Sequence, residues 1–533
     1  MTQSSAVRAS EEESVNEKHL NYQDQVDFAH TESLDYSGLE RPRYHYSYLR
    51  KLTFCVATIT LSSTNTGYDG SMLNLQVLDS WSSEMGNPSG SRLGALNNAT
   101  GFGAIISFPI SQWITDRYGR KPAIMLGNIL MIIGGVLQGA STNYAFFLVV
   151  RLILGLGNGI VTVASPTLIS EISYAPHRNI CTSVYNVCWY VGAIIAAWVT
   201  YGTRNINSNY AWKIPSYLQA FVPLVEISFI FFVPESPRYL VAKGKIDKAR
   251  EIISKYHFGN GTDERSLRLI EGEMKEVELA LEMEKITSKS SYMDFIRIPS
   301  FRKRLFYVCF LTVMMQLSGN GLVSYYLNKV LDSIGITNET KKLQINGCLM
   351  IYNFVCSAVF AYFTTLFKRR TLFISSTALM ATTFIIWTVL SAINQERNFK
   401  QKSLANGVLA MIFLFNLSYN LGMNGLPFLY VTEVLPYSHR AKGMNIFSVL
   451  LQLILIYNGF VNPIAMDAIE WKYYIVYCCI LVVEVVVVLL TFVETSGYTL
   501  EEVAKVFGDD PDTIIPQLLS AGKLTKVDHV EYV

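Results

Sequence analysis

Two ionisable side chains lie inside stretches of the sequence that are otherwise apolar, and their types suit proton-linked chemistry. Asp69 belongs to the motif Gly67-Tyr68-Asp69-Gly70, and Arg151 opens a stretch with glycines at 155, 157 and 159. Charged groups are costly in lipid, so those found there are commonly functional. A carboxylate and a guanidinium that face one cavity can pair while it is dry and separate when the carboxyl takes a proton. The alternatives are a permanent buried ion pair, or an Asp69 at the rim of a cavity.

A second set of charged residues lies at the ends of apolar stretches, on what we expect to be one side of a membrane. Each cluster combines an acid with a base. Charged contacts at a common depth can hold two helical bundles together and release them when a cavity opens. A single pair would more simply serve solubility, but four clusters favour a gate. The predicted gate residues are Asp116, Arg117, Gly119, Arg120, Glu171, Arg178, Glu235, Arg238, Glu433 and Arg440.

The remaining motifs argue against an enzyme. The glycines at 155, 157 and 159 follow no strand, so close helix packing explains them better than a dinucleotide loop does. The sequence contains no phosphate loop, zinc motif or nucleophile elbow. All eight cysteines fall inside apolar stretches, where free thiols are the default. We predict no enzymatic activity, no metal site and no cofactor.

The elements that must position these residues are membrane helices. Of the 533 residues, 50% are hydrophobic and only 16% are charged, whereas an ordinary soluble domain carries about 25% charge. A net charge of +2 offers no broad basic face for nucleic acid. Apolar runs long enough to cross a lipid bilayer recur six times in each of two blocks. The predicted spans are 52–72, 92–114, 122–140, 145–168, 181–203, 214–233, 305–328, 343–367, 371–393, 405–432, 444–466 and 471–493.

The expected fold is therefore all-α, a polytopic membrane protein with twelve transmembrane helices in two six-helix bundles. The first span is unusually polar, which indicates either a misread loop or a helix that faces a water-filled cavity. Apolar residues at helical spacing in 245–257 and 263–286 predict two amphipathic helices between the bundles. The predicted domains are a disordered N-terminal tail (1–51), an N-terminal bundle (52–233), a helical linker (234–304), a C-terminal bundle (305–493) and a C-terminal tail (494–533).

The distribution of Lys and Arg predicts the orientation of the chain in the membrane. These residues gather before span 1, between spans 2 and 3, between spans 8 and 9, and after span 10. By the positive-inside rule, that side, with both termini and the central linker, is cytoplasmic. No short apolar stretch follows a basic start, so we expect no cleavable signal peptide. In this topology only Asn338, between spans 7 and 8, could carry a glycan.

In combination, these motifs resemble the sugar porter family of the major facilitator superfamily, and the resemblance runs from span 1 to just past span 12. It is carried by Gly67-Tyr68-Asp69, 116–121, Arg151, 171–178, 234–238, 316–319, 433–440 and Glu494-Thr495. Within that family, the stretches 185–190, 318–326, 440–443 and 460–463 look like the fungal lactose and cellodextrin permease group.

The resemblance implies the major facilitator fold, a central sugar site and alternating access by rocking of the two bundles. It also implies that Asp69 binds the coupled proton and that Arg151 is its partner. Sugar recognition needs amides, hydroxyls and an aromatic face. Any single amide or hydroxyl in a span could instead make an interhelical hydrogen bond. The sugar-binding residues carried over by position are Asn186, Gln316, Ser318, Asn320, Tyr325, Tyr326, Asn353, Asn424 and Phe428.

Departures from the family pattern shape the expected substrate. The Gln that hexose porters have in span 5 is Asn186 here, their Asn in span 7 is Gly321, and their Trp in span 10 is Phe428. Smaller groups would widen the cavity and favour a disaccharide such as lactose or cellobiose. The loop between spans 8 and 9 has lost the family's Asp and Gly, which predicts a weaker gate in the second half.

The leading expectation is a monomeric, proton-coupled sugar symporter in a fungal plasma membrane, whose partners are a small sugar and the lipid bilayer. Two alternatives stay open. One is a passive facilitator for a hexose or a pentose, and the other is a sugar sensor that does not transport.

Overall fold

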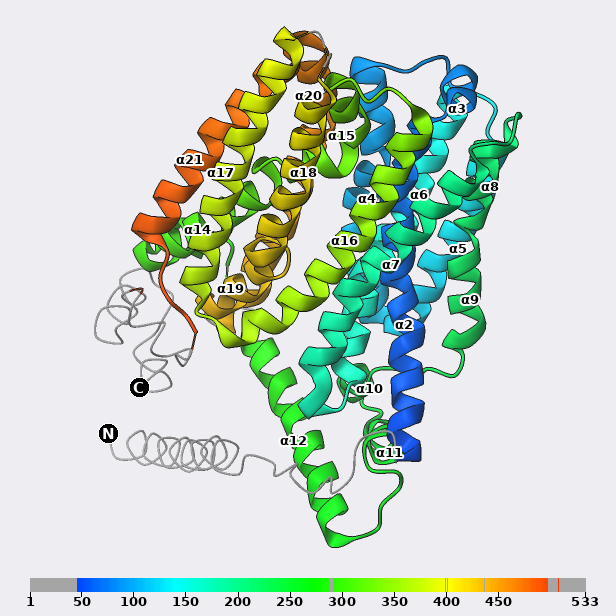
Figure 1. Ribbon diagram of the computed structural model, residues 1–533. Helices are drawn as coiled ribbons and strands as arrows, with labels where there is room; N and C mark the ends of the chain where they lie inside the picture. The colour runs from blue at the N-terminus through cyan, green and yellow to red at the C-terminus, as the bar shows by residue number, and fades with distance from the viewer. Residues whose placement is uncertain are drawn as a thin grey trace, which may run out of the picture.

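The computed structural model describes residues 46–287, 291–397, 399, 401–435, 437–496 and 507. Within these residues every regular element is a helix, and Figure 1 shows them as two bundles side by side. Most of the two predicted tails, 1–51 and 494–533, lies outside the described residues. The predicted all-α, two-bundle membrane fold is confirmed.

The N-terminal bundle contains spans 1 to 6. Its first helix begins before the predicted start at residue 52, because Leu49 and Leu52 are buried against Tyr174. The polar span 1 is a continuous helix rather than a misread loop. The helices of this bundle are α2 (Ser47–Met72), α4 (Gly90–Tyr118), α5 (Arg120–Ala140), α6 (Tyr144–Ile172), α7 (Arg178–Thr203), α8 (Tyr210–Leu218) and α9 (Phe221–Ile230), with the short α3 (Asp79–Glu84) in a loop.

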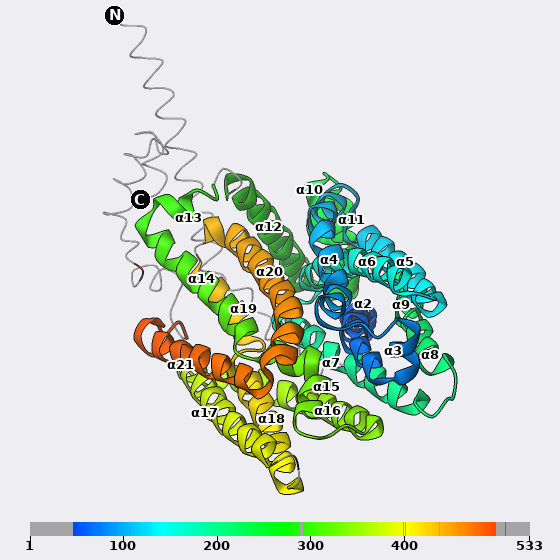
Figure 2. The same cartoon turned by 90° about the horizontal axis from the view of Figure 1, so that it is seen from above.

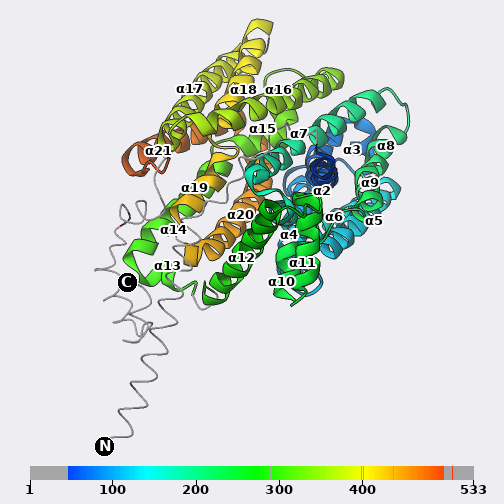
Figure 3. The same ribbon diagram turned by 90° about the horizontal axis from the view of Figure 1, so that it is seen from below.

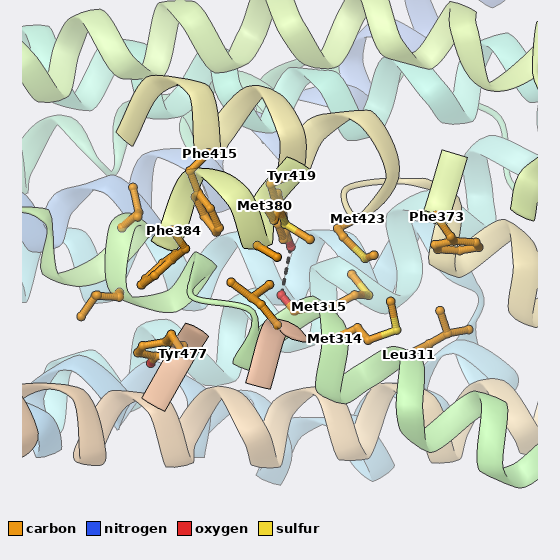
Figure 4. Packing of buried hydrophobic residues seen from close by; sticks show 14 of the residues in the cluster. Leu311, Met314, Met315, Phe373, Met380, Phe384, Phe415, Tyr419, Met423 and Tyr477 are labelled. Carbon is orange, nitrogen blue, oxygen red and sulfur yellow. Dashed lines mark hydrogen bonds between the residues drawn. The ribbon is translucent and has the colours of Figure 1, made fainter. Parts of the chain in front are cut away.

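The C-terminal bundle contains spans 7 to 12. Its core combines aliphatic side chains with aromatic and sulfur-containing ones, several of which Figure 4 shows packed between α14, α17 and α18. The helices are α14 (Pro299–Leu317), α15 (Asn320–Ser333), α16 (Glu339–Leu366), α17 (Arg369–Glu396), α18 (Lys402–Gly422), α19 (Leu426–Val434), α20 (Tyr437–Ile469) and α21 (Tyr473–Thr491).

Eight stretches of the described residues are long and apolar enough to cross a membrane, and the last of them holds both α20 and α21. The spans formed by α2, α4 and α8–α9 are not among them. α2 and α4 carry many hydroxyl and amide side chains, and α8 and α9 are each too short. Large apolar side chains such as Phe232 and Leu490 are 64% and 79% exposed, as expected for groups that face lipid.

Three spans are broken into two helices, namely α8–α9, α14–α15 and α18–α19. Pro223 has no N–H to donate to the carbonyl of Gln219, which explains why span 6 does not continue as one helix. Span 7 breaks at Gly319, whose φ of +103° is a conformation that glycine adopts without strain. The sequence predicts a continuous span at each of these three places.

Four helices follow the N-terminal bundle and lie at one end of the molecule, which we call the loop face; the other end is the opposite face. They are α10 (Pro237–Ala242), α11 (Ile246–His257), α12 (Glu264–Thr287) and α13 (Asp294–Arg297). The two predicted amphipathic helices are therefore confirmed as α11 and α12. His257 of α11 holds them to the bundle, because its ring nitrogens lie 2.7 Å from Glu273 Oε2 and 3.0 Å from the carbonyl oxygen of Ile172.

The two bundles meet along two pairs of helices. α4 packs against α20, and α7 packs against α16. Figures 2 and 3, which view the molecule from above and from below, show these four helices between the bundles. A cavity enclosed by α4, α7 and α20 is consequently walled by both halves of the chain.

Candidate functional site

A cavity of about 230 Å³ lies between the two bundles. Most of its wall comes from α2, α4, α6 and α7, and α15 and α20 complete it from the C-terminal bundle. Amides and hydroxyls alternate with aromatic rings on this wall, a combination that suits a polar ligand with apolar faces. Its polar and aromatic residues are Thr66, Asp69, Asn97, Asn98, Thr100, Phe108, Arg151, Asn158, Thr162, Trp189, Tyr326 and Gln452.

Asp69 and Arg151 form the predicted ion pair on the wall of this cavity. Nη1 of Arg151 lies 2.9 Å from Oδ1 of Asp69, and the two side chains are 2% and 5% exposed, respectively. Nε2 of Gln219 donates a second hydrogen bond to the same carboxylate oxygen, at 2.8 Å. A buried carboxylate is stable only with such partners. Donors from two other segments of the bundle therefore contact the Asp69 carboxyl in this structure.

Gln219 is a site residue that the sequence interpretation missed. A single amide in an apolar span carries no pattern, but Pro223, four residues later, was a usable signal. The helix ends before this proline, and Gln219 lies at the junction of α8 and α9. The junction turns its amide toward Asp69.

The predicted sugar-binding residues are spread over several environments. Tyr326 lines the cavity and is buried, whereas Asn186 is exposed on α7. Phe428 is 40% exposed and packs edge-on against Phe447, with ring centroids 5.1 Å apart. Oδ1 of Asn320 accepts a hydrogen bond from Ser324, at 3.1 Å. The side chain of Tyr325 lies outside the described part of the chain.

Gln316 and Ser318 flank the break between α14 and α15. Gln316 Oε1 and Ser318 Oγ are buried and have no partner among the described residues. The break also frees backbone carbonyls, and side chains satisfy two of them. Tyr419 donates to the carbonyl of Met315 at 3.1 Å, as drawn in Figure 4, and Asn458 donates to that of Gln316 at 2.7 Å. The two unpartnered polar atoms at the break are buried, and neither Gln316 nor Ser318 lines the cavity in this structure.

Asn353 and Asn424 belong to a chain of amides that links α16 to α18. Nδ2 of Asn424 donates to Oδ1 of Asn420 at 3.0 Å, and Nδ2 of Asn420 donates to Oδ1 of Asn353 at 3.2 Å. The hydroxyl of Tyr190 on α7 lies 3.4 Å from the Asn420 amide oxygen. In this structure the two predicted residues make the interhelical hydrogen bonds that were the alternative interpretation.

Contacts between the bundles close the cavity toward the opposite face. Nδ2 of Asn97 on α4 donates to the hydroxyl of Tyr326 at 2.9 Å, and that hydroxyl donates to the carbonyl of Gly459 on α20 at 2.6 Å. Next to them, Asn98 donates to the carbonyl of Ile456 at 3.1 Å. All of these groups are uncharged.

At the loop face, two ion pairs that include predicted gate residues each lie within one bundle. In the N-terminal bundle, Arg120 of α5 lies 3.0 and 3.1 Å from the two carboxylate oxygens of Glu171 on α6. In the C-terminal bundle, Arg369 of α17 lies 3.5 Å from Glu433 of α19. These two pairs stabilise the ends of their own bundles in this structure, and a role as a gate stays a prediction.

The carboxylate of Glu235, in the stretch 234–238, contacts the first residues of α5. It accepts hydrogen bonds from the backbone N–H groups of Arg120 and Lys121, at 3.1 and 3.2 Å, at the start of α5. Gly119 has a φ of +106°, and a Cβ on it would lie 2.5 Å from Oε2 of Glu235. Burial raises the pKa of the Glu235 carboxyl, although these N–H groups oppose the rise. The motif thus caps the N-terminus of α5.

Replacing Glu235 by Gln is expected to destabilise this end of the bundle by about 1–2 kcal/mol. The amide has one acceptor oxygen, so its NH₂ group would face the N–H of Arg120 or Lys121. Relief from burying a charge offsets part of the loss. The measurement is the thermal unfolding midpoint of the solubilised protein, with Glu264→Gln as the control because that carboxylate is exposed. Equal midpoints for wild type and Glu235→Gln would contradict the capping role.

The same cap recurs in the C-terminal bundle. Glu494 accepts from the backbone N–H groups of Arg369 and Arg370 at the start of α17, at 2.9 and 3.1 Å. Lys368, at the position before this helix, has a φ of −63°, so no glycine is required there. The loss of the family's Asp and Gly from this loop therefore leaves the cap in place.

The other predicted gate residues lie around these caps. Asp116 accepts from Gln112 at 3.0 Å, and the guanidinium of Arg117 lies 5.7 Å from the ring centroid of Trp113. Arg178 is exposed at the first residue of α7. Arg238 follows Pro237 at the start of α10, and Arg440 lies in the first turn of α20.

The glycines at 155, 157 and 159 permit close helix packing, as predicted. A Cβ on Gly155 would lie 2.1 Å from the carbonyl oxygen of Thr100 on α4, and one on Gly157 would lie 2.7 Å from that of Gly127 on α5. α6 therefore packs backbone to backbone against two neighbours. This packing fixes the position of Arg151 on the same helix.

Asn338, the predicted glycan acceptor, lies at the N-cap of α16 and is exposed. Its side-chain oxygen accepts a hydrogen bond from the backbone N–H of Lys341 at 3.1 Å. The described residues contain no group of three or more His, Cys, Asp or Glu side chains that could hold a metal ion.

A polar cavity between two membrane-embedded bundles, closed at one face and carrying an ion pair on its wall, defines a membrane transporter. The twelve spans have the arrangement of the major facilitator fold. The match of a family model described as "Sugar (and other) transporter" extends over residues 47–507. The chain belongs to this family of membrane transporters and is not an enzyme.

Individual proteins agree with this assignment. The MFS-type transporter criB of Aspergillus cristatus is 27% identical over 461 residues, which cover 86% of this chain and 94% of that protein. The low-affinity glucose transporter HXT3 of Saccharomyces cerevisiae is 27% identical over 425 residues, covering 78% and 74%. The inward open conformation of the xylose transporter XylE from E. coli shares the fold, with a TM-score of 0.70 at 19% identity, over 85% of this chain and 99% of that one.

Proposed function

We propose that this chain is a proton-coupled sugar symporter of the plasma membrane, that it works by alternating access, and that its loop face is cytoplasmic. The observation that supports the proposal most is the Asp69–Arg151 ion pair on the wall of the cavity, at 2.9 Å. Protonation of Asp69 would remove the attraction to Arg151 and keep the hydrogen-bond partner Gln219. The cavity wall would therefore have two states, one with the Asp69–Arg151 ion pair closed and one with a neutral Asp69 released from Arg151.

The coupling has enough energy for accumulation. One proton that moves inward contributes about 2.3 kcal/mol per 100 mV of membrane potential. A factor of ten in concentration costs about 1.4 kcal/mol. A single coupled proton can therefore concentrate a neutral sugar more than tenfold.

The proposed substrate is a disaccharide such as lactose or cellobiose. Gln316 Oε1 and Ser318 Oγ are buried without a described partner on the side of the C-terminal bundle, where sugar hydroxyls could bind. Trp189 and Tyr326 offer aromatic surface on the cavity wall. The side chains at Asn186 and Gly321 are smaller than those at the matching positions of hexose porters, although neither residue lines the cavity in this structure. The similarity to the glucose transporter HXT3 favours a hexose facilitator as the second candidate.

Uptake by a yeast strain that lacks its own sugar transporters tests both candidates. We expect labelled lactose or cellobiose to accumulate against its gradient, and a protonophore to abolish this accumulation. The Asp69→Asn variant should still exchange labelled for unlabelled sugar without concentrating it. Uptake that only equilibrates, for glucose or xylose alone, would establish a facilitator; absence of uptake despite surface expression would favour a sensor.

A further inference from the structure

A second carboxyl group, Glu226 of α9, is buried in the N-terminal bundle. Its exposed fraction is 0%, and none of the ion pairs found among the described residues includes it. A bare carboxylate at such a place would cost several kcal/mol. A carboxyl in such a place is more stable with a proton than without one.

Two hydroxyl groups connect Glu226 to the neighbouring helices. Ser62 of α2 makes a short hydrogen bond to Oε1 of Glu226, and Ser165 of α6 donates to the Ser62 hydroxyl at 2.8 Å. Asn128 of α5 and Tyr185 of α7 are the other polar groups that face this carboxyl. The site is thus built by four helices around one acid, and neither of these two neighbours carries a positive charge.

Glu226 lies in register with the ion pair at the cavity. Ser62 precedes Asp69 by seven residues on α2, and Glu226 follows Gln219 by seven residues on the antiparallel span 6. Seven residues are two helical turns, or about 10 Å. The Asp69–Gln219 contact and the Ser62–Glu226 contact therefore connect the same two spans, two helical turns apart. The second contact lies nearer the loop face.

A row of small polar side chains, which we call the seam, connects these two contacts. Thr66 of α2 donates to Oδ1 of Asn158 on α6 at 2.7 Å, and both residues line the cavity, as Thr162 does. Ser165 follows Thr162 on α6 by three residues, on the same face of that helix. The cavity therefore reaches from Asp69 to within one turn of the Ser165–Ser62–Glu226 chain. The cavity itself, at about 230 Å³, has room for water beside Asp69.

We propose that Glu226 is a second proton-binding carboxyl of the transport cycle, which takes the proton from Asp69 and releases it toward the loop face. This inference rests on the proposed proton coupling. The surroundings of the two acids differ as the inference requires. Asp69 is paired with Arg151, whereas Glu226 contacts the Ser62 hydroxyl and is in no ion pair among the described residues.

The proton balance of the step is simple. The O–H bond of the Asp69 carboxylic acid breaks, and the Asp69 carboxylate closes its ion pair with Arg151. Water and hydroxyl groups along the seam carry the proton, and an O–H bond forms on the Glu226 carboxylate. Glu226 later gives this proton to water at the loop face, which returns it to the ionised form for the next cycle.

The C-terminal bundle supplies a matched control. Glu484 of α21 is 1% exposed, and neither carboxylate oxygen has a partner among the described residues. α21 packs against α14, α17 and α20, all in the other bundle from Asp69. Glu484→Gln therefore removes a buried acid without touching the seam.

The experiment compares Glu226→Gln with Glu484→Gln and wild type in the yeast assay. Two quantities are measured on the same cells, the accumulation ratio of the sugar that wild type concentrates and its rate of equilibrium exchange, which needs no net proton movement. We expect Glu226→Gln to lower the accumulation ratio at least fivefold while exchange falls less than twofold. Glu484→Gln should leave both at wild-type values.

The outcomes separate this inference from the proposed function. If wild type shows no protonophore-sensitive accumulation, the proposed function fails and this inference fails with it. If wild type accumulates sugar and Glu226→Gln does so equally, only this inference is overturned. If Glu226→Gln does not reach the membrane, Ser62→Ala takes its place, because it removes the hydroxyl between Ser165 and the acid. Normal accumulation in that variant would also overturn the inference.

Discussion

Replacement of Arg151 by Ala is expected to reduce concentrative sugar uptake at least tenfold, to the level of simple equilibration. Arg151 is the only cation in an ion pair with Asp69 among the described residues, and both side chains are almost fully buried. Without the guanidinium, the carboxyl can avoid an unpaired buried charge only by keeping its proton. Removal of one partner of a buried pair typically costs about 3–5 kcal/mol, so we also expect less folded protein.

A double variant separates the two effects. Asp69→Asn combined with Arg151→Gln removes both charges, so the folded amount should return toward wild type while accumulation stays absent. Arg92→Gln is the matched control, because Arg92 is exposed over the ring of Tyr144, away from the cavity. Accumulation in the Arg151→Ala variant at the wild-type ratio would show that the ion pair has only a structural role.

Replacement of Gly192 by Ala is expected to destabilise the protein by about 3 kcal/mol. A Cβ at this position of α7 would lie 1.7 Å from the carbonyl oxygen of Thr64 and 2.7 Å from the backbone nitrogen of Tyr68. Both atoms belong to the backbone of α2, which carries Asp69, so the helices would have to separate. The measurement is the amount of monodisperse protein after solubilisation and heating, relative to wild type.

Gly202 provides the control on the same helix. A Cβ there would meet nothing within 4 Å, so Gly202→Ala should leave stability unchanged or raise it slightly, because alanine favours helix. If the two variants had equal stability, the close approach of α2 and α7 would not limit the fold. Transport by the Gly192→Ala protein that remains reports whether the position of Asp69 is sensitive to helix separation.

Much of the fold follows from the sequence, because charge scarcity and the length of apolar runs are strong signals. The linker helices α11 and α12 were predicted from apolar spacing, and the structure places them close to the expected bounds. The breaks in spans 6, 7 and 10 were missed, since hydropathy averages over a break. Pro223 and Gly319 mark two of the three breaks, but each also occurs in continuous membrane helices.

The sequence predicts the site residues that carry a charge inside an apolar span. It does not predict those whose role depends on which neighbouring helix they contact. Asp69 and Arg151 were identified because ionisable groups are rare in spans, and the structure brings them together. Glu226 belonged to the same class, yet it stands in no motif and was passed over. Asn424 and Asn353 were assigned to the sugar, while the structure shows them bonded within an amide chain. Which partner an amide finds depends on helix register, which a single sequence does not contain.

Two ion pairs and two helix caps at the loop face each lie within one bundle, so they can stay closed in the proposed transport cycle. Arg120 and Glu171 need not separate when the bundles rock, and neither do Arg369 and Glu433. In that cycle each half would move as one preassembled lever, and the contacts that must break would include the neutral ones near Tyr326. Substitutions within a lever should therefore change how much transporter a cell contains, and substitutions at the interface should change how fast each molecule turns over.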